Sequence, residues 1–305
     1  MKIAYIITAY QDPQQLGRLV HALDYQGKTS FFIHIDKKVD IAPFRNKCKA
    51  EDLTFIKDRE WVSWAGFSQV KSLVKLLCCV FQRSEFFDRI VCISGTDYPV
   101  CSNQKIFEEF DTHSDLQYII AHNISQSKNR AKISQYWLCD FKVKSRFIWK
   151  CWYHASSKIL KFLSKVIGRR TKIFLNGSLC DVWFSSDYWA LTNDCALYLL
   201  NTFNENKKFQ QEMKYYFAPS ELWAATIICN SKFKNSIVKI FEDAPEVSDV
   251  TPLSYLEYYS TGVRVMNETD LKKILNSKKI FFRKAASVVS DELLTVIDQL
   301  RNRGC

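Results

Sequence analysis

The chain has 305 residues, of which 47% are apolar and 25% are charged, and this balance excludes a disordered tail or a fibre. The length fits one large domain or two small ones. The formal net charge is +11, but segment 141–180 holds ten basic residues and no Asp or Glu, which leaves 33 bases against 32 acids elsewhere. This concentration disfavours a uniformly basic nucleic-acid binder, and the basic segment needs a local explanation.

The first part of the chain predicts alternating strands and helices. Asp12-Pro13 marks the start of a helix with proline at its first position, and Ser94 to Pro99 is expected to be a turn. This order predicts an α/β fold with a mostly parallel sheet and helices on both faces. Buried strands are predicted over residues 3–8, 31–35, 53–56 and 89–94, and a strong helix over 68–81.

The second half is less regular. Helices are predicted over about 193–203, 222–228 and 290–301. We find no internal repeat and no linker, so we expect one domain over 1–305. Its nucleotide-binding half is 1–115, and its acceptor-binding and catalytic half is 116–305, with a basic amphipathic insert at about 141–180.

Cysteine usage and hydropathy bear on the compartment. Eleven cysteines, several of them inside apolar runs and none in a C-x-x-C pair, favour buried free thiols over disulfides. The N-terminus is strand-like, so we expect no signal peptide. No apolar run approaches the ~20 residues of a membrane span.

Polar residues follow three of the predicted strands. In parallel sheets, ligands bind beyond the carboxyl ends of the strands, so these residues outline a nucleotide pocket. The chain has no G-x-G-x-x-G or Walker motif, which leaves a Rossmann dehydrogenase and a P-loop enzyme unsupported. The clusters are Ala9-Tyr10-Gln11, Asp36-Lys37-Lys38 and Gly95-Thr96-Asp97.

A nucleotide-binding half followed by an aromatic-rich half suggests a nucleotide-sugar transferase. Most such folds hold the diphosphate through a metal on an Asp-x-Asp pair, and this chain has none. Asp58-Arg59-Glu60 is the nearest match, and a solvated turn explains it better. Without a metal, lysine and arginine must offset the charge of the leaving diphosphate.

Several segments, in order and spanning nearly the whole chain, carry a family resemblance. They include Ile33-His34-Ile35-Asp36-Lys37-Lys38, Trp61-Val62-Ser63-Trp64-Ala65-Gly66, Ser94-Gly95-Thr96-Asp97-Tyr98-Pro99, Ser185-Ser186-Asp187-Tyr188-Trp189, Pro219-Ser220-Glu221-Leu222-Trp223 and Ile280-Phe281-Phe282-Arg283-Lys284. On these segments the chain resembles the core-2/I-branching N-acetylglucosaminyltransferases, a family that includes the peptide O-xylosyltransferases and bacterial members. The resemblance implies a GT-A-like fold, an inverting reaction and no divalent metal or other cofactor.

The resemblance also implies a catalytic base. Glu221 matches the acid of the family's Pro-Asp-Glu motif, and an inverting displacement needs one carboxylate to take the acceptor proton. Its expected place at the start of a helix favours the ionised form. A purely capping role for Glu221 is the alternative. The middle position of the motif is Ser220 here, which departs from the family.

The donor residues follow by position. Lys284 matches the family's diphosphate-binding lysine, and Arg264 is expected to match its paired arginine, with solvated loop bases as the alternative. Asp36 resembles the acid that contacts uridine, although it could simply cap its strand. Trp61 falls where an aromatic ring stacks on uracil, with core packing equally open, while His34 is interpreted as structural.

The acceptor residues follow in the same way, from the family's Gly-Ser-Gln-Trp-Trp-like segment. We expect Ser186, Asp187, Tyr188 and Trp189 to bind the acceptor. The changes at Ser185 and Asp187 leave the acceptor sugar open. Tyr10 stands where relatives often have histidine.

The basic segment predicts a helix with an apolar stripe and lysines on the polar side. Trp149, Trp152 and Tyr153 precede this stripe, as in helices that lie in an anionic membrane interface. An ordinary packed helix with a solvated basic face is equally open, and nucleic acid has no supporting motif. The stripe is Ile159, Leu160, Phe162, Leu163, Val166 and Ile167, and the lysines are Lys158, Lys161 and Lys165.

The expected protein is therefore a metal-independent transferase that moves N-acetylglucosamine from its UDP donor to a hydroxyl of a cell-surface glycan precursor. The expected partners are a UDP-sugar, a glycan acceptor that a lipid could carry, and an anionic membrane surface, with no nucleic acid. We expect a cytoplasmic protein, peripheral at the inner membrane face. A xylosyl or other hexosyl transferase, or a non-catalytic membrane-associated scaffold, is the alternative.

Overall fold

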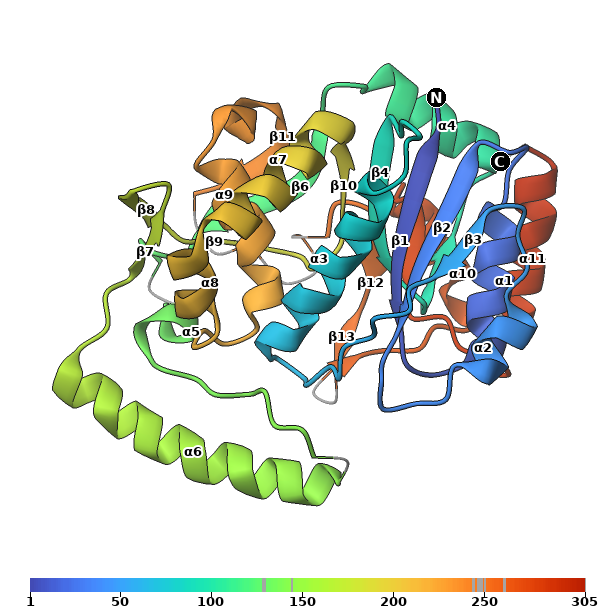
Figure 1. The fold of residues 1–305 in the computed structure, drawn as a ribbon. Helices are drawn as coiled ribbons and strands as arrows, with labels where there is room; N and C mark the ends of the chain where they lie inside the picture. The colour runs from blue at the N-terminus through green and yellow to red at the C-terminus, as the bar shows by residue number, and fades with distance from the viewer. Residues whose placement is uncertain are drawn as a thin grey trace.

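The computed structural model describes residues 1–127, 130–143, 145–242, 245, 249, 251–259 and 262–304. Its main sheet has the strand order β11-β6-β10-β4-β1-β2-β3, with β9 paired to β6 (Figure 1). The strands are β1 (Ile3–Ala9), β2 (Thr29–Ile35), β3 (Leu53–Phe55), β4 (Arg89–Ser94), β6 (Gln117–Asn123), β9 (Trp183–Ser185), β10 (Trp189–Thr192) and β11 (Ile237–Phe241).

The centre of the sheet is parallel. Strand β1 pairs in parallel with β2 and β4, and β2 pairs in parallel with β3, whereas β10 runs antiparallel to both β4 and β6. Every residue of β2 is buried, as expected for a parallel strand that helices cover on both faces. This arrangement confirms the predicted α/β fold with a mostly parallel sheet.

Helices cover both faces of the sheet and form two separate cores. Leu77 of α3 and Leu199 of α7 belong to one core, and Leu16 of α1 and Leu293 of α11 belong to the other. The Asp12 side chain accepts a hydrogen bond from the Gln15 amide and caps α1, as Asp12-Pro13 predicted. These helices are α1 (Pro13–Leu23), α3 (Phe67–Phe81), α7 (Asn193–Glu205), α9 (Trp223–Cys229), α10 (Leu271–Asn276) and α11 (Asp291–Asn302).

The predicted turn at 94–99 is wrong in part, because residues 97–99 form a strand. A three-stranded sheet, β12-β15-β5, consists of β5 (Asp97–Pro99), β12 (Ser254–Leu256) and β15 (Phe281–Arg283). Its register pairs Arg283 with Asp97. Long-range pairing of this kind leaves no local signal in the sequence. It brings the C-terminal part of the chain to the carboxyl end of β4.

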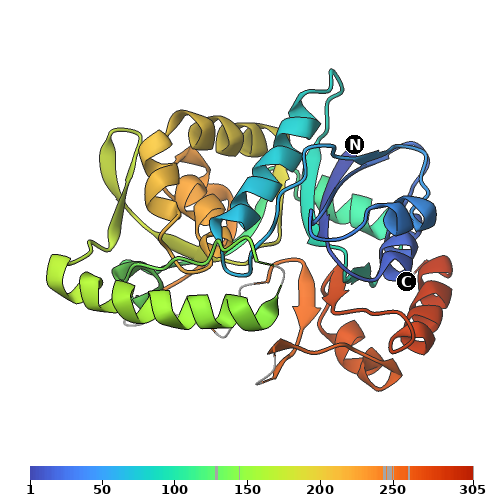
Figure 2. The ribbon, with the colours of Figure 1, turned by 60° about the horizontal axis from the view of Figure 1, so that its bottom comes forward.

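The remaining elements surround this frame. Helix α6 (Arg146–Ile167) runs along the outside of the molecule in both views (Figure 1, Figure 2). Among the described residues, no helix is long and apolar enough to cross a membrane. The others are α2 (Ala42–Lys47), α4 (Asn103–Thr112), α5 (Ala131–Ser134), α8 (Lys207–Met213), and the hairpins β7 (Lys172–Leu175) with β8 (Ser178–Asp181) and β13 (Tyr258–Tyr259) with β14 (Gly262–Val263).

Candidate active site

A cavity of about 300 Å³ opens at the carboxyl ends of the parallel strands. Thr8 lies in β1, Asp36 directly follows β2, and Ser94 ends β4, and all three line the cavity. The cavity therefore lies at the strand ends where the sequence placed two of its three polar clusters. The third cluster, Gly95-Thr96-Asp97, does not line it: Asp97 is fully buried and accepts hydrogen bonds from the Ser94 amide and the Ser254 hydroxyl.

Asp36 lines the cavity and holds Lys38, which also lines it. Its Oδ1 accepts from the Lys38 amide at 2.9 Å, and the Lys38 ammonium lies 3.2 Å from its Oδ2. His34 lies beside it, fully buried, and its Nε2 accepts from the Glu60 amide at 2.8 Å. Burial lowers the pKa of His34 to about 4, so a neutral ring holds the loop in place. These contacts support a structural His34.

The tryptophan that lines the cavity is Trp64 rather than Trp61. Val62 and Trp64 line the cavity, whereas the half-buried Trp61 does not. The Trp64 side chain is 62% exposed, which leaves its face open to a ligand. Alternate residues of an extended segment point to opposite sides, so a motif match alone could not choose between these tryptophans.

Asp58 and Glu60, the nearest match to a metal-binding pair, hold a lysine. The Lys75 ammonium lies 2.7 Å from an Asp58 oxygen and 2.6 Å from a Glu60 oxygen. Asp58 is also exposed to solvent. These contacts agree with a solvated turn and give the two carboxylates a partner already.

Glu221 lies in a 3₁₀ turn, Pro219–Glu221, that precedes α9. Its carboxylate, 27% exposed, forms an ion pair with the Lys132 ammonium from α5. Burial raises the pKa of Glu221, and the neighbouring Asp187 raises it too, whereas Lys132 lowers it. The direction of this pKa shift is opposite to the one expected from a helix start, because burial outweighs the favourable charges.

Asp187 is the second acid of the site. It lines the cavity together with Ser220, whose hydroxyl donates to the Gln69 side chain at 3.3 Å. Burial raises the pKa of Asp187, and the charges of Arg283 and Lys132 oppose that shift. Glu221, Asp187, Lys132 and Arg283 are thus close enough to influence one another, and of these four only Asp187 lines the cavity.

Only part of the predicted acceptor segment faces the cavity: Tyr188 lines it, whereas Trp189 does not. The Tyr188 ring lines the cavity and lies 4.1 Å from the Arg283 guanidinium, and the Ser186 hydroxyl accepts from the Tyr188 amide at 3.2 Å. Trp189 is fully buried within β10, so its assignment to acceptor binding is wrong. A tryptophan beside a polar segment looks like a ligand platform in sequence, but the inward register of β10 makes it part of the core.

Lys284 and Arg264 meet through their backbones. The Lys284 amide donates to the Arg264 carbonyl at 3.1 Å. The Arg264 guanidinium is already paired with Glu257 and Asp270, so its charge is compensated. No described carboxylate pairs with the Lys284 ammonium, whose pKa is lowered by burial and by the charge of Arg283. Lys284 therefore stays the better candidate for an anionic ligand.

Sequence reasoning missed two residues of this site. Lys132 lies in the short helix α5, in a stretch without any sequence motif, and only the folded chain brings it to Glu221. Arg283 was visible, because it directly precedes Lys284 in the quoted motif. Its position in β15, paired opposite Asp97, turns it towards the two acids.

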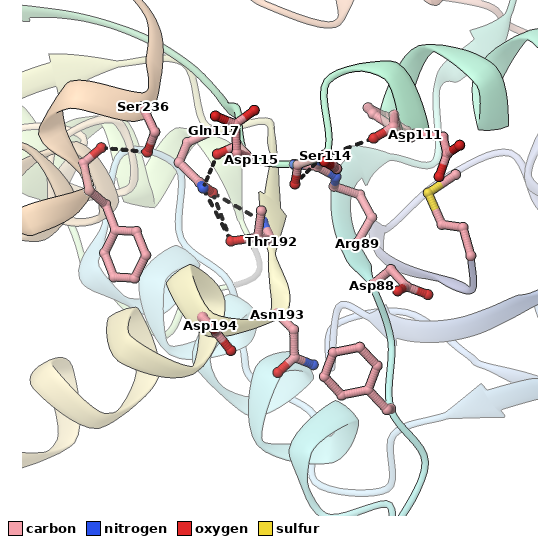
Figure 3. A pocket seen from close by; sticks show the side chains of 14 residues that line it. Asp88, Arg89, Asp111, Ser114, Asp115, Gln117, Thr192, Asn193, Asp194 and Ser236 are labelled. Atoms are coloured by element: carbon pink, nitrogen blue, oxygen red, sulfur yellow. Dashed lines mark hydrogen bonds between the residues drawn. The ribbon is translucent and has the colours of Figure 1, made fainter.

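A larger cavity of about 520 Å³ lies elsewhere, at the start of β4 (Figure 3). Several of its polar side chains are already used in hydrogen bonds of the fold. Gln117 donates to the Thr192 hydroxyl at 3.1 Å, and the Arg89 guanidinium donates to backbone carbonyls that include that of Leu116. These bonds join strand ends and leave no convergent chemistry, so we do not place the active site there.

No curated protein matches the sequence. Among solved structures, mouse xyloside xylosyltransferase 1 in its apo form is similar, with a TM-score of 0.32, 13% sequence identity, and coverage of 75% of this chain and 82% of that chain. The model of the Core-2/I-Branching enzyme family matches residues 3–240. The chain therefore belongs to the Core-2/I-branching family of glycosyltransferases.

Proposed function

We propose that the protein is an inverting transferase that moves N-acetylglucosamine from UDP-N-acetylglucosamine to a hydroxyl of a cell-surface glycan precursor, without a divalent metal. One observation carries the proposal. The Glu221 carboxylate lies within electrostatic reach of Asp187, which lines the cavity at the carboxyl ends of the parallel strands. Family membership supports a nucleotide-sugar donor and a glycan acceptor.

The chemistry is a single displacement. Glu221 takes the proton of the acceptor hydroxyl, and the acceptor oxygen forms a bond to the anomeric carbon of the donor. The bond between that carbon and the phosphate oxygen breaks, and its electron pair leaves with UDP. The raised pKa of Glu221 suits a base that must hold the proton after transfer.

The leaving diphosphate gains negative charge that the protein must offset. Lys284 supplies an ammonium that no described carboxylate neutralises. The Arg264 carbonyl accepts a hydrogen bond from the Lys284 amide. The Arg264 guanidinium forms ion pairs with Glu257 and Asp270, so its role is structural. A fixed cation of this kind stabilises developing charge without reorganising water. Asp36 and Trp64 line the cavity where we place the nucleotide.

Replacement of the base tests the reaction. Glu221→Gln keeps the shape of the side chain but cannot accept a proton, so we expect transfer to fall by about 10³-fold while UDP still raises the melting temperature. Glu292→Gln, an exposed change on α11, is the matched control. Full turnover by Glu221→Gln would contradict the assignment of Glu221 as the base. Absence of both UDP binding and turnover in the native protein would favour a non-catalytic scaffold.

Donor and metal are tested in the same assay. A panel of UDP-N-acetylglucosamine, UDP-xylose and UDP-hexoses identifies the donor sugar. A preference for UDP-xylose would make the protein a xylosyltransferase instead of an N-acetylglucosaminyltransferase. We expect EDTA to leave the rate unchanged, because Lys75 already neutralises Asp58 and Glu60. A strong loss of activity in EDTA, restored by added magnesium or manganese, would contradict the metal-free mechanism.

We place this reaction in the cytoplasm, at the inner face of the membrane, with the acceptor glycan carried by a lipid. The support is the net charge, which is concentrated in the acid-free segment 141–180. Fractionation of cells that express the full chain tests the location. Recovery from the soluble fraction alone would contradict it.

A further inference from the structure

Helix α6 contacts the rest of the protein along one side only. The Trp149 indole donates to the Cys139 carbonyl at 3.3 Å, and the Ser164 hydroxyl accepts from the Tyr136 amide at 2.8 Å. Trp149 also stacks on Tyr153 with ring centres 5.0 Å apart. Both aromatic rings thus pack inward, and of the three predicted interface aromatics only Trp152 points to solvent.

Another side of α6 is apolar and exposed, and of its residues Trp152 contacts Phe141, with ring centres 6.3 Å apart. The side chains of Ile159, Phe162 and Val166 are 62%, 67% and 68% exposed. Their spacing of three and four residues places them on one face of a helix. Monomeric proteins seldom expose a continuous apolar surface of this kind without a use for it. We call this surface the α6 apolar face; it comprises Ile148, Trp152, Ile159, Phe162, Leu163, Val166 and Ile167, all of them exposed.

A stripe of lysines borders the α6 apolar face. Lys150, Lys158, Lys161 and Lys165 are all exposed, and their spacing puts them on one flank of the helix. No Asp or Glu occurs between residues 141 and 180, so no acid of this segment offsets them. Apolar side chains next to unpaired cations are what an anionic lipid surface binds, with the chains in the acyl boundary and the cations among the headgroups.

A second copy of the chain fits this face less well. In a two-fold dimer the same surface meets itself, so the lysines of one α6 would approach those of the other. Neither helix carries an acid to separate these charges. Like charges across an interface are unfavourable, whereas anionic lipids satisfy both the apolar and the basic part of the surface.

The inward side of α6 leads to the active site through aromatic contacts. The ring of Trp149 lies 5.9 Å from that of Trp64, which lines the cavity, and Trp64 lies 5.6 Å from Phe217. Phe217 precedes the turn that carries Glu221. A surface bound to the outer side of α6 is therefore separated from the cavity by few layers of side chains.

We propose that α6 lies in the interface of an anionic membrane and holds the mouth of the cavity at the bilayer surface. Where the acceptor is concerned, this rests on the proposed function, because it places a lipid-linked glycan within reach of Glu221. The docking itself depends only on the α6 apolar face and its lysines.

Vesicle flotation of the full chain tests the docking. We expect the protein to float with vesicles of equimolar phosphatidylcholine and phosphatidylglycerol, to stay behind with pure phosphatidylcholine, and to bind less as salt rises. Changing Lys158, Lys161 and Lys165 to Glu should weaken binding on the order of a hundredfold or more. Changing Lys47, Lys105 and Lys272 to Glu alters the net charge equally on other exposed sites and should matter much less.

A second pair of variants tests the apolar contribution. Phe162→Ser with Val166→Ser should reduce flotation, whereas Val288→Ser, at another exposed apolar site, should not. Two results would overturn the proposal: no flotation of the native protein with anionic vesicles, or a dimer in sedimentation that Phe162→Ser with Val166→Ser dissociates. A thermal shift with UDP on the same samples tests the proposed function separately. A protein that binds UDP but does not float would contradict only the membrane docking.

Discussion

The Lys132 ammonium is paired with the Glu221 carboxylate, although 89 positions separate the two residues in the chain. The contact is fixed from both sides. The Lys132 carbonyl accepts from the Phe217 amide at 3.1 Å, and its ammonium lies 4.3 Å from the centre of the Phe184 ring. This lysine therefore helps to position the proposed base and lowers its pKa against the effect of burial.

Removal of Lys132 should move the pH dependence of the reaction. Lys132→Gln removes a charge that lowers the pKa of Glu221 and leaves Arg283 to oppose burial and Asp187, so this pKa rises further. A base works only when ionised, so the acid limb of kcat/KM should shift to higher pH, with a loss on the order of tenfold at neutral pH, the size of one charged hydrogen bond. Lys132→Arg should restore the limb, and Lys207→Gln is the control. An unmoved acid limb would rule out this role.

The change Asp187→Asn should move the same limb in the other direction. Asp187 raises the pKa of Glu221 as a like charge, so its removal lets Glu221 ionise at lower pH. Since Asp187 also lines the cavity, we expect a higher KM for the acceptor. The measurement is a pH profile of kcat/KM beside that of Lys132→Gln. Parallel shifts of both variants would show that geometry, not charge, controls the base.

Much of the frame could be predicted from the sequence, because local patterns specify it. Strand β2 is a run of buried apolar residues, and α1 begins at Asp12-Pro13 as expected. The small sheet could not be predicted, since its pairing of Arg283 with Asp97 joins distant segments. Family motifs located Glu221, but the burial that raises its pKa is a property of the folded site.

The same limit applies to individual side chains of the site. Trp61 and Trp64 share one motif, and only the path of the loop decides which ring reaches the cavity. Trp189 matched an acceptor segment, and its register in β10 buries it instead. A motif gives a position along the chain, whereas the direction of a side chain depends on its strand and neighbours.

His34 should make stability depend on pH. Burial lowers the pKa of His34 from 6.5 to about 4, so between these values the unfolded chain takes up a proton that the native protein does not. Stability from this group is present above pH 6.5 and lost as the pH falls to about 4, by about 3 kcal/mol in total. Urea unfolding at several pH values, compared with His34→Gln, measures the difference, since glutamine can still accept from the Glu60 amide. A constant difference across this range would contradict a buried neutral His34.

Gly66 should resist substitution because of Asp140. A Cβ atom at Gly66 would clash with the Asp140 Oδ1, far inside van der Waals contact. This carboxylate accepts from the Ser68 amide and, at 2.5 Å, from the Ser68 hydroxyl, so it binds the first turn of α3. Gly66→Ala must displace it, and we expect a loss of about 1–3 kcal/mol in unfolding free energy.

A double-mutant cycle separates this clash from other effects at Gly66. Asp140→Ala alone loses the contacts to Ser68, and the steric conflict of Gly66→Ala then has no partner. The two changes should therefore cost less together than the sum of their separate effects. Because the Gly66 φ is −94°, alanine adopts the backbone without strain, and additive costs would mean that the clash with Asp140 is not what requires glycine here.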